Sequence, residues 1–349
     1  MEGNVRSYNV VHLPGDGIGP EVTAVARDLV DQAGKRHGFT LDWQHSPLGS
    51  EHYLRTGEVL SDETLNDLRT ADAIFLGAVG SPSVPPGVLE RGLLLRLRFE
   101  LDLYVNLRPA KQRPGVDTAG ADNLDFIVVR ENTEGLYAGA GGIAHQGSSF
   151  EVATEESLNT RAGVERCIRY AAGLAKRRSG KLTLVHKTNV LVNAGSLWMR
   201  AAKEVATAEG VELDYAHVDA ACLYMVSDPG RFDVIVTDNL FGDILTDLAA
   251  ALTGGLGLSA SGNLNPDKTG PSMFEPVHGS APDIAGTGKA NPAGAVLSAS
   301  LMLDHLGEQH AAAELESAVD AVLSTGGAAT AQAWADALAE QLAHTEVPS

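Results

Sequence analysis

An apolar run followed at once by an amphipathic pattern constrains the fold of this chain most. Residues 232–236 have the composition of a buried strand, and residues 241–248 carry apolar side chains at helical spacing. Asp243 and Asp247 are four residues apart, so they share one face near the helix start. Such strand-to-helix turns are where α/β proteins place ligands. Carboxylates without Cys or His at ligand spacing suit a hard divalent ion, Mg²⁺ or Mn²⁺.

A third acidic candidate is Asp219, which closes a strand-like run over residues 215–218. Aspartates chosen at random are more often solvated surface residues than metal ligands. The surroundings of these three carboxylates therefore decide between helix capping and metal binding.

Alternation of strand and helix patterns continues along the whole chain and predicts an α/β fold with a largely parallel sheet. The glycines at 15, 17 and 19 do not match the G-x-G-x-x-G spacing, so we predict no standard Rossmann unit. The predicted strands are 10–13, 39–45, 73–79, 126–130 and 182–191. The predicted helices include 61–70, 90–98, 155–177, 293–306, 311–324 and 329–342.

Length and charge limit the possible partners. The 349 residues suffice for two domains, and the net charge of -19 argues against binding to nucleic acid or anionic membranes. Cys167 and Cys222 are isolated thiols, which fit a reducing cytoplasm. We expect neither a signal segment nor a membrane span, because no apolar run approaches the roughly 20 residues that a bilayer requires.

Several cationic side chains lie beside predicted breaks in regular structure. Arg98, Arg108 and Arg130 would form a pocket for a di- or tri-acid if they converged, because guanidinium groups bind carboxylates bidentately. Each arginine alone is more often a surface residue. Lys187 follows an apolar run, where burial can lower its pKa enough for proton transfer, although a lysine can also extend to solvent.

The stretch 274–286 is predicted as a long loop of turn-forming residues. Gly279 and its neighbours could enclose an adenosine, and Asp283 could accept hydrogen bonds from both ribose hydroxyls. An acid at this position repels a 2′-phosphate, so the loop favours NAD over NADP.

Six motifs occur together and in order, and the chain from about Val10 to Leu306 resembles the β-decarboxylating hydroxyacid dehydrogenases. Any one of these motifs is only suggestive, whereas six in the right order are highly specific. They are GDGIGPE at 15–21, NLRP at 106–109, VRENTEG at 129–135, VHKTNVL at 185–191, TDNLFGDILTD at 237–247 and EPVHGSAPDIAG at 275–286.

The resemblance implies a two-domain α/β homodimer whose active sites are shared between subunits. Residues 1–103 and 255–349 would form a discontinuous cofactor-side domain. Residues 104–254 would form the substrate and dimerisation domain, with an arm near 138–150. The substrate would be a small hydroxy di- or tri-acid.

The resemblance also implies residue roles. Arg98, Arg108 and Arg130 would bind the malate carboxylates, while Asp243 and Asp247 would bind the divalent ion together with Asp219 of the partner subunit.

Lys187 of the partner subunit, helped by Asp219, would take the hydroxyl proton as hydride passes to NAD⁺. Tyr137 would then protonate the enol carbon, and Asn189 would position the nicotinamide. The adenosine would be bound by His278, Gly279, Ser280, Ala281, Asp283, Ile284 and Asn291.

The substituent on the malate is the least constrained part of the prediction. Leu94 and Leu95 stand where isocitrate enzymes present Ser and Asn, which favours an alkyl substituent and hence 3-isopropylmalate, an intermediate of leucine biosynthesis. Leucines are also ordinary helix core. Arg91 or Arg96 could instead favour an anionic substituent. The alternatives are isocitrate, homoisocitrate, D-malate, tartrate or 3-phosphonomethylmalate, or a non-catalytic regulatory subunit.

Overall fold

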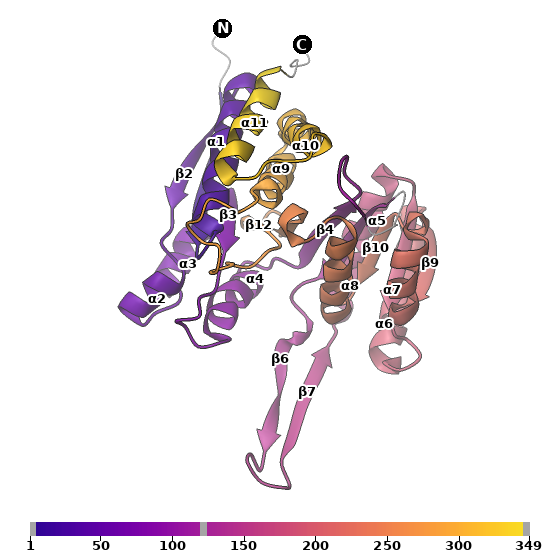
Figure 1. The fold of residues 1–349 in the computed structure, drawn as a ribbon. Coiled ribbons are helices and arrows are strands. Elements are labelled where there is room, and N and C mark those ends of the chain that lie inside the picture. Colours follow the sequence, from indigo (N-terminus) through magenta and orange to yellow (C-terminus); the bar gives the residue numbers. More distant parts are fainter. Residues whose placement is uncertain (1–4, 119–123, 345–349) are drawn as a thin grey trace. The chain divides into compact units, whose positions relative to one another are not determined.

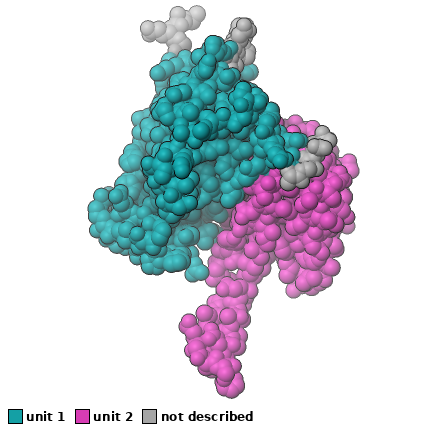
Figure 2. Space-filling view, viewed as in Figure 1, with its two compact units in different colours: residues 1–103, 112–119, 253–349 teal, residues 104–111, 120–252 magenta. Residues whose placement is uncertain are grey.

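A computed structural model describes residues 5–118 and 124–344 of the chain. These residues divide into two compact units (Figure 2). Unit 1 comprises 1–103, 112–119 and 253–349, and unit 2 comprises 104–111 and 120–252. Strands and helices alternate along both units, which confirms the predicted α/β class. The functional roles expected for the two halves stay predictions.

Unit 1 contains five strands in the order β2-β1-β3-β12-β11, of which the last pair is antiparallel and the others are parallel. Side chains alternate between the two faces of this sheet. On one face, Val11 and Leu13 of β1 pack with Leu93 and Leu97 in a buried cluster. On the other, His12 contacts Thr23 of α1. The strands are β1 Arg6–Gly15, β2 Phe39–His45, β3 Ala73–Ala78, β11 Ala260–Leu264 and β12 Ser272–Pro276.

The helices of unit 1 form two groups. Helices α1, α9, α10 and α11 pack against one another, while α3 and α4 contribute leucines to the cluster on the opposite face of the sheet. Their bounds are α1 Gly19–His37, α2 Ser50–Thr56, α3 Asp62–Leu68, α4 Arg96–Glu100, α9 Ala293–Leu306, α10 Gln309–Ser324 and α11 Ala331–His344. The shorter turns are the π-helix η1 Glu90–Leu95 and the 3₁₀ turn η3 Leu256–Leu258.

The main sheet of unit 2 has the strand order β4-β5-β10-β8-β9, and among these five strands only the β4–β5 pair is antiparallel. Apolar residues of β5, β8 and β10 pack with those of α7 and α8 in one buried cluster. Helices α5 and α6 pack together. The elements are β4 Val105–Lys111, β5 Asp125–Glu131, β8 Lys181–His186, β9 Glu212–His217, β10 Val234–Thr237, α5 Arg161–Arg177, α6 Val192–Glu209, α7 Val218–Ser227, η2 Pro229–Arg231 and α8 Asn239–Leu252.

An antiparallel hairpin extends from unit 2 (Figure 1). Its strands are β6 Gly135–Ala144 and β7 Val152–Leu158, and every residue of β7 is exposed. The predicted helix over 155–177 was therefore wrong in its first part. The helix begins at Arg161, where the Thr160 side chain accepts a hydrogen bond from the amide of Gly163 as an N-cap.

Three further boundaries differ from the predictions. The strand predicted over 182–191 ends at His186, so Lys187 lies in the turn that leads to α6. Asp219 lies in the first turn of α7 instead of closing a strand. The loop predicted over 274–286 starts as the end of β12, which is buried against β3.

Among the residues that the structure describes, no helix is long and apolar enough to cross a membrane.

The turn between β1 and α1 joins three segments of unit 1. One carboxylate oxygen of Asp16 accepts hydrogen bonds from the amide and hydroxyl of Ser50 at 2.8 and 2.6 Å, and the other accepts from the amide of Gly80 at 2.8 Å. Gly17 has φ +59°, and a Cβ there would lie 1.9 Å from the Ser280 carbonyl oxygen. The glycine turn thus allows a close approach of the 278–286 loop.

Replacing Asp16 with alanine should lower the free energy of unfolding by about 2–4 kcal/mol, because two part-buried amides and one hydroxyl lose the acceptor that a buried carboxylate supplies. Chemical denaturation would measure this loss. The matched change Asp42→Ala removes an exposed carboxylate from β2 and should cost under about 0.5 kcal/mol. Equal losses in the two variants would contradict this account of Asp16.

Candidate active site

A buried arginine forms the centre of the polar cluster in unit 2. The Arg130 side chain is 1% exposed at the carboxyl end of β5. Its Nε and one terminal nitrogen donate to Oδ1 of Asn239 at 3.0 and 2.7 Å, and the other terminal nitrogen donates to Oδ1 of Asp243 at 2.5 Å. The Tyr137 hydroxyl donates to the second Asp243 oxygen at 2.9 Å. The structure thus brings Arg130, Tyr137 and Asp243 together.

The charges in this cluster set the protonation of its members. Burial by itself would raise the pKa of Asp243, but the Arg130 charge and the hydrogen bonds from Tyr137 and Arg130 outweigh it and hold this pKa below its usual range. Burial, supported by the Asp243 charge, raises the pKa of the Tyr137 hydroxyl against the opposing effect of Arg130. Near neutral pH the cluster therefore holds an ionised Asp243 beside a protonated tyrosine.

Small and polar residues of helix α8 allow it to pack closely against Arg130. Gly242 lies against the Arg130 methylenes, where a Cβ would come within 2.4 Å of Cγ. The Asn239 amide nitrogen donates to the carbonyl oxygen of Glu134 at 3.1 Å, so Asn239 connects Arg130 to the start of the hairpin. Asp247 lies one turn beyond Asp243 and is exposed.

Arg108 faces the same side of the strand pair as Arg130. In the antiparallel register Asn106 is opposite Arg130 and Arg108 is opposite Val128, so all four residues share one face. The Arg108 Nε donates to Oδ1 of Asn106 at 3.0 Å, and the charge of Arg108 contributes to the lowered pKa of Asp243.

A second pair of predicted residues also meets in unit 2. The Lys187 ammonium donates to a carboxylate oxygen of Asp219 at 2.6 Å. This hydrogen bond is the main cause that lowers the pKa of Asp219. Asn189 lies exposed in the same turn as Lys187.

The remaining substrate candidates belong to unit 1. Arg98 is buried, and a terminal nitrogen lies 3.5 Å from a carboxylate oxygen of Glu275. Leu94 and Leu95 are half-buried in the π-helix η1, whereas Leu93 of the same turn is fully buried core. Single π-helical turns are frequent at functional sites. Arg96 donates to the carbonyl oxygen of Leu60 and to Asp62, so its guanidinium is already engaged.

The predicted adenosine residues form a loop that packs on the β1–α1 turn. The Ser280 carbonyl oxygen accepts from the amide of Ile18 at 2.9 Å, and Ala281 has φ 40°. The exposed members are Gly279 and Asp283. Ile284 and Asn291 are half-buried. His278 Nδ1 contacts the Gly279 carbonyl oxygen, and its Nε2 is buried without a hydrogen-bond partner in the described part of the chain.

Sequence reasoning missed three buried polar residues beside the predicted ones. Asn239 accepts hydrogen bonds from Arg130 and so orients it. The other two are His186, the residue directly before Lys187, and Asp238, and a ring nitrogen of His186 lies 3.5 Å from a carboxylate oxygen of Asp238. Burial lowers the pKa of His186 to about 4 and raises that of Asp238 to about 6. All three polar side chains stand at the carboxyl ends of buried strands, which is the signal that could have identified them.

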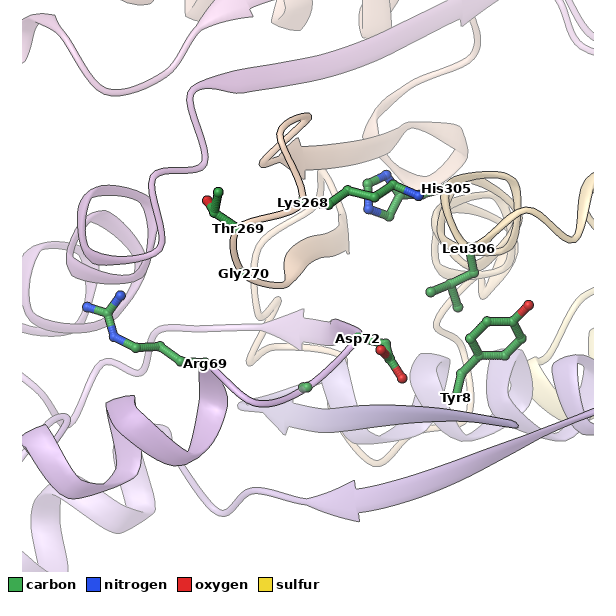
Figure 3. Close-up of a pocket in the computed structure, with 9 residues that line it drawn as sticks. Tyr8, Arg69, Asp72, Lys268, Thr269, Gly270, His305 and Leu306 are labelled. Carbon is green, nitrogen blue, oxygen red and sulfur yellow. The ribbon is translucent and has the colours of Figure 1, made fainter. Parts of the chain in front are cut away.

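Of two cavities in the described part of the chain, one is lined by a predicted site residue. In unit 2 a cavity of about 500 Å³ is lined by Lys187, Asp238 and several apolar side chains, among them Leu191 and Phe241. In unit 1 a polar pocket of about 340 Å³ lies at the amino ends of β3 and β12, with Asp72, Lys268 and His305 around it (Figure 3). The second pocket contains none of the predicted site residues.

Within the ranges 5–118 and 124–344, no three His, Cys, Asp or Glu side chains of one chain are grouped as ligands for a single ion. The predicted metal site, with Asp219 of the partner subunit as third acidic ligand, stays a prediction.

Comparison with known proteins gives a family match over most of the chain. The profile of the isocitrate/isopropylmalate dehydrogenase family matches residues 9–346. A 3-isopropylmalate dehydrogenase from Thermobifida fusca is 58% identical over 322 residues, 90% of this chain and 91% of that protein. One from Mycobacterium tuberculosis is 57% identical over 318 residues, 90% and 94% of the two chains.

Solved structures agree with this match. A crystal structure of isocitrate dehydrogenase from Methylococcus capsulatus has a TM-score of 0.87 at 40% identity, and the alignment covers 96% of this chain and 99% of that chain. A β-decarboxylating dehydrogenase from Thermococcus kodakarensis has a TM-score of 0.79 at 36% identity, with 96% of both chains covered. The predicted fold class is therefore confirmed.

Glu131 should make stability depend on pH between about 4.5 and 7. Burial raises the pKa of this carboxyl from 4.5 to about 7, although Thr133 and Glu134 donate hydrogen bonds to it. The folded state then binds more protons than the unfolded state, so stability falls as pH rises through this window. From pH 5 to 7.5 the wild type should lose about 2 kcal/mol more unfolding free energy than Glu131→Gln.

Urea denaturation at each pH would measure this difference. Glu156→Gln, at an exposed position of β7, is the control and should keep the pH dependence of the wild type. Parallel stability curves for the wild type and Glu131→Gln would show that Glu131 is ionised throughout.

Proposed function

The chain belongs to the isocitrate/isopropylmalate dehydrogenase family, and from that premise we propose that it catalyses the NAD-dependent oxidative decarboxylation of (2R,3S)-3-isopropylmalate to 4-methyl-2-oxopentanoate. This reaction is a step of leucine biosynthesis, and we place the enzyme in the cytoplasm as part of the proposal. The free thiols Cys167 and Cys222 suit that reducing compartment.

The observation that carries the proposal is the contact of Asp243 with both Arg130 and Tyr137. A buried guanidinium beside an ionised carboxylate and a protonated phenol offers a carboxylate-binding group, a potential metal ligand and a proton donor at one place. Oxidation of a hydroxy acid followed by loss of carbon dioxide needs all three.

Proton transfer would be divided between two residues. Lys187, oriented by Asp219, takes the proton of the substrate hydroxyl, while hydride leaves the carbon that bears this hydroxyl for the nicotinamide. Carbon dioxide is then lost, and the Tyr137 hydroxyl delivers a proton to the neighbouring carbon. The raised pKa of Tyr137 supports its role as the donor, since the phenol stays protonated at neutral pH.

The cofactors fit the residues that would hold them. Asp243 and Asp247 present oxygen ligands one helical turn apart, which suits Mg²⁺ or Mn²⁺. The unpartnered Nε2 of His278 and the exposed Asp283 suit the adenosine of NAD, and Asn189 suits its nicotinamide. When bound, the ion supplies polarisation of the substrate oxygens and the nicotinamide supplies the hydride acceptor.

Exposed apolar side chains support a homodimer with shared sites. Leu223 and Val226 of α7 are 63% and 49% exposed, and Ile244 of α8 is 51% exposed. The hairpin adds Ile143 and Phe150 at 58% and 78%. Apolar groups of this kind are typical of surfaces that another chain covers. In such a dimer, Lys187 and Asp219 would serve the site of the opposite subunit.

Substrate choice would depend on Leu94 and Leu95, with Arg98, Arg108 and Arg130 binding the carboxylates. The relatives at 57–58% identity are named 3-isopropylmalate dehydrogenases, and half-buried leucines suit an isopropyl group. The isocitrate dehydrogenase similarity at 40% identity keeps isocitrate as the second candidate. Arg96 is engaged by Asp62 and Leu60, which disfavours it as the ligand of an anionic substituent.

NAD⁺ reduction with Mg²⁺ or Mn²⁺ across 3-isopropylmalate, isocitrate, homoisocitrate, D-malate, tartrate and 3-phosphonomethylmalate tests the proposal. We expect kcat/KM for 3-isopropylmalate to exceed that for isocitrate at least about a hundredfold, because an apolar pocket rejects a carboxylate. Chelation should abolish turnover. Leu95→Ala should lower kcat/KM for 3-isopropylmalate about tenfold and leave that for D-malate, which lacks the substituent, nearly unchanged. A preference for isocitrate would overturn the substrate assignment.

Gly242→Ala should lower kcat about a hundredfold, because the new Cβ would displace the Arg130 side chain that holds Asp243. Alanine is the better helix former by about 1 kcal/mol, so the helix itself gains. The control Gly173→Ala, in α5, adds a Cβ where no atom lies within 4 Å and should keep full activity. Full activity in Gly242→Ala would contradict the role of this contact.

A further inference from the structure

The turn that carries Lys187 is held by several backbone contacts. The Lys187 carbonyl oxygen accepts hydrogen bonds from the amides of Val190 and Leu191 at 3.0 and 2.9 Å. Its side chain extends to Asp219 at 2.6 Å. Lys187 follows directly after β8, so the peptide groups on its two sides determine where its ammonium can reach.

A single hydroxyl from the neighbouring strand contacts both of these peptide groups. The Tyr215 oxygen lies 3.2 Å from the His186 carbonyl oxygen, which precedes Lys187, and 3.2 Å from the Thr188 amide nitrogen, which follows it. The Thr188 hydroxyl oxygen lies 2.9 Å away. Tyr215 belongs to β9, the last strand in the order of unit 2, which pairs with β8 in parallel.

His217 fixes the orientation of this tyrosine. The two residues are two positions apart on β9, so their side chains lie on one face of the strand. Nδ1 of His217 lies 2.7 Å from the Tyr215 oxygen, the shortest contact that the hydroxyl makes. A phenol has one proton to donate and two lone pairs. The hydroxyl donates this proton to the His186 carbonyl oxygen, and its lone pairs accept from the Thr188 amide and from Nδ1 of His217.

The opposite side of the turn is closed by α6. Gly195 lies so near that a Cβ would come within 2.6 Å of the Thr188 Cα. Thr188 is therefore enclosed between a helix backbone and the Tyr215 hydroxyl. Loss of the hydroxyl frees only one side, so the turn would shift toward β9 without unfolding.

We propose that Tyr215, oriented by His217, is a positioning residue that places the side-chain nitrogen of Lys187 for its role as the proton acceptor in the reaction proposed above. Tyr215 touches neither substrate nor cofactor in this role. It acts through the two peptide groups beside Lys187. The inference rests on the proposed function only in taking Lys187 as the residue that accepts the hydroxyl proton.

A double-mutant cycle between Tyr215→Phe and Lys187→Ala tests the proposal. Tyr215→Phe should lower kcat about tenfold or more and leave the substrate KM within about threefold, because a displacement under 1 Å weakens proton transfer more than binding. In the Lys187→Ala background the same change should alter kcat less than about twofold. Equal losses in both backgrounds, or no loss in the wild type, would overturn the proposal.

Tyr8→Phe is the matched control. It also removes one hydroxyl, which donates to Glu308 at 2.7 Å in unit 1. We expect wild-type kcat from this variant, and the melting temperatures of the two variants show whether folding explains any loss.

Hydrogen exchange of the Thr188 amide gives a readout that needs no turnover. Exchange should be about tenfold faster in Tyr215→Phe and unchanged in Tyr8→Phe, because only the first variant removes the acceptor of this amide. Unchanged exchange in Tyr215→Phe overturns the positioning role whatever the activity. If the wild type oxidises none of the malates, the proposed function fails, while exchange still decides whether Tyr215 holds the turn.

Discussion

The ion pair between Arg130 and Asp243 is the interaction on which unit 2 depends most. A guanidinium that is 1% exposed must be compensated, because an unpaired buried charge costs several kcal/mol. Asn239 and Asp243 provide that compensation from one helix, and Gly242 makes the approach possible. The same residues would bind the substrate and the metal. The folding of unit 2 and the proposed reaction therefore require the same residues in the first two turns of α8.

Unit 1 also contains a buried charged side chain whose hydrogen bonds connect neighbouring segments, but here the side chain is a carboxylate. Asp16 stands at the carboxyl end of β1 and accepts hydrogen bonds from Ser50 and Gly80, which follow β2 and β3. Polar groups at the ends of parallel strands face backbone amides that have no partner in the sheet. One aspartate satisfies them and holds three loops at the place where the 278–286 loop packs.

Sequence patterns predicted the elements whose periodicity is strong. The helix expected over 293–306 and the strand over 39–45 have those bounds in the structure. Residues 155–158 of β7 were read as helix, because the side chains of this strand are exposed and no apolar alternation marks it. Asn239 was missed for a different reason. Its importance depends on a buried arginine 109 residues away, and only the tertiary structure brings the two together.

Because η1 is a π-helical turn, the number of residues between 90 and 95 determines which side chains would face the proposed substrate. A π-helical turn holds one more residue than an α-helical turn. Removing Leu95 would restore α-helical winding and place Leu94 two residues from Leu97 instead of three, which rotates it by about 100°. Leu97 and Arg98 lie beyond the turn and would keep their places in α4. A single-codon deletion could thus exchange the lining of the pocket in evolution while the core beneath it stays the same.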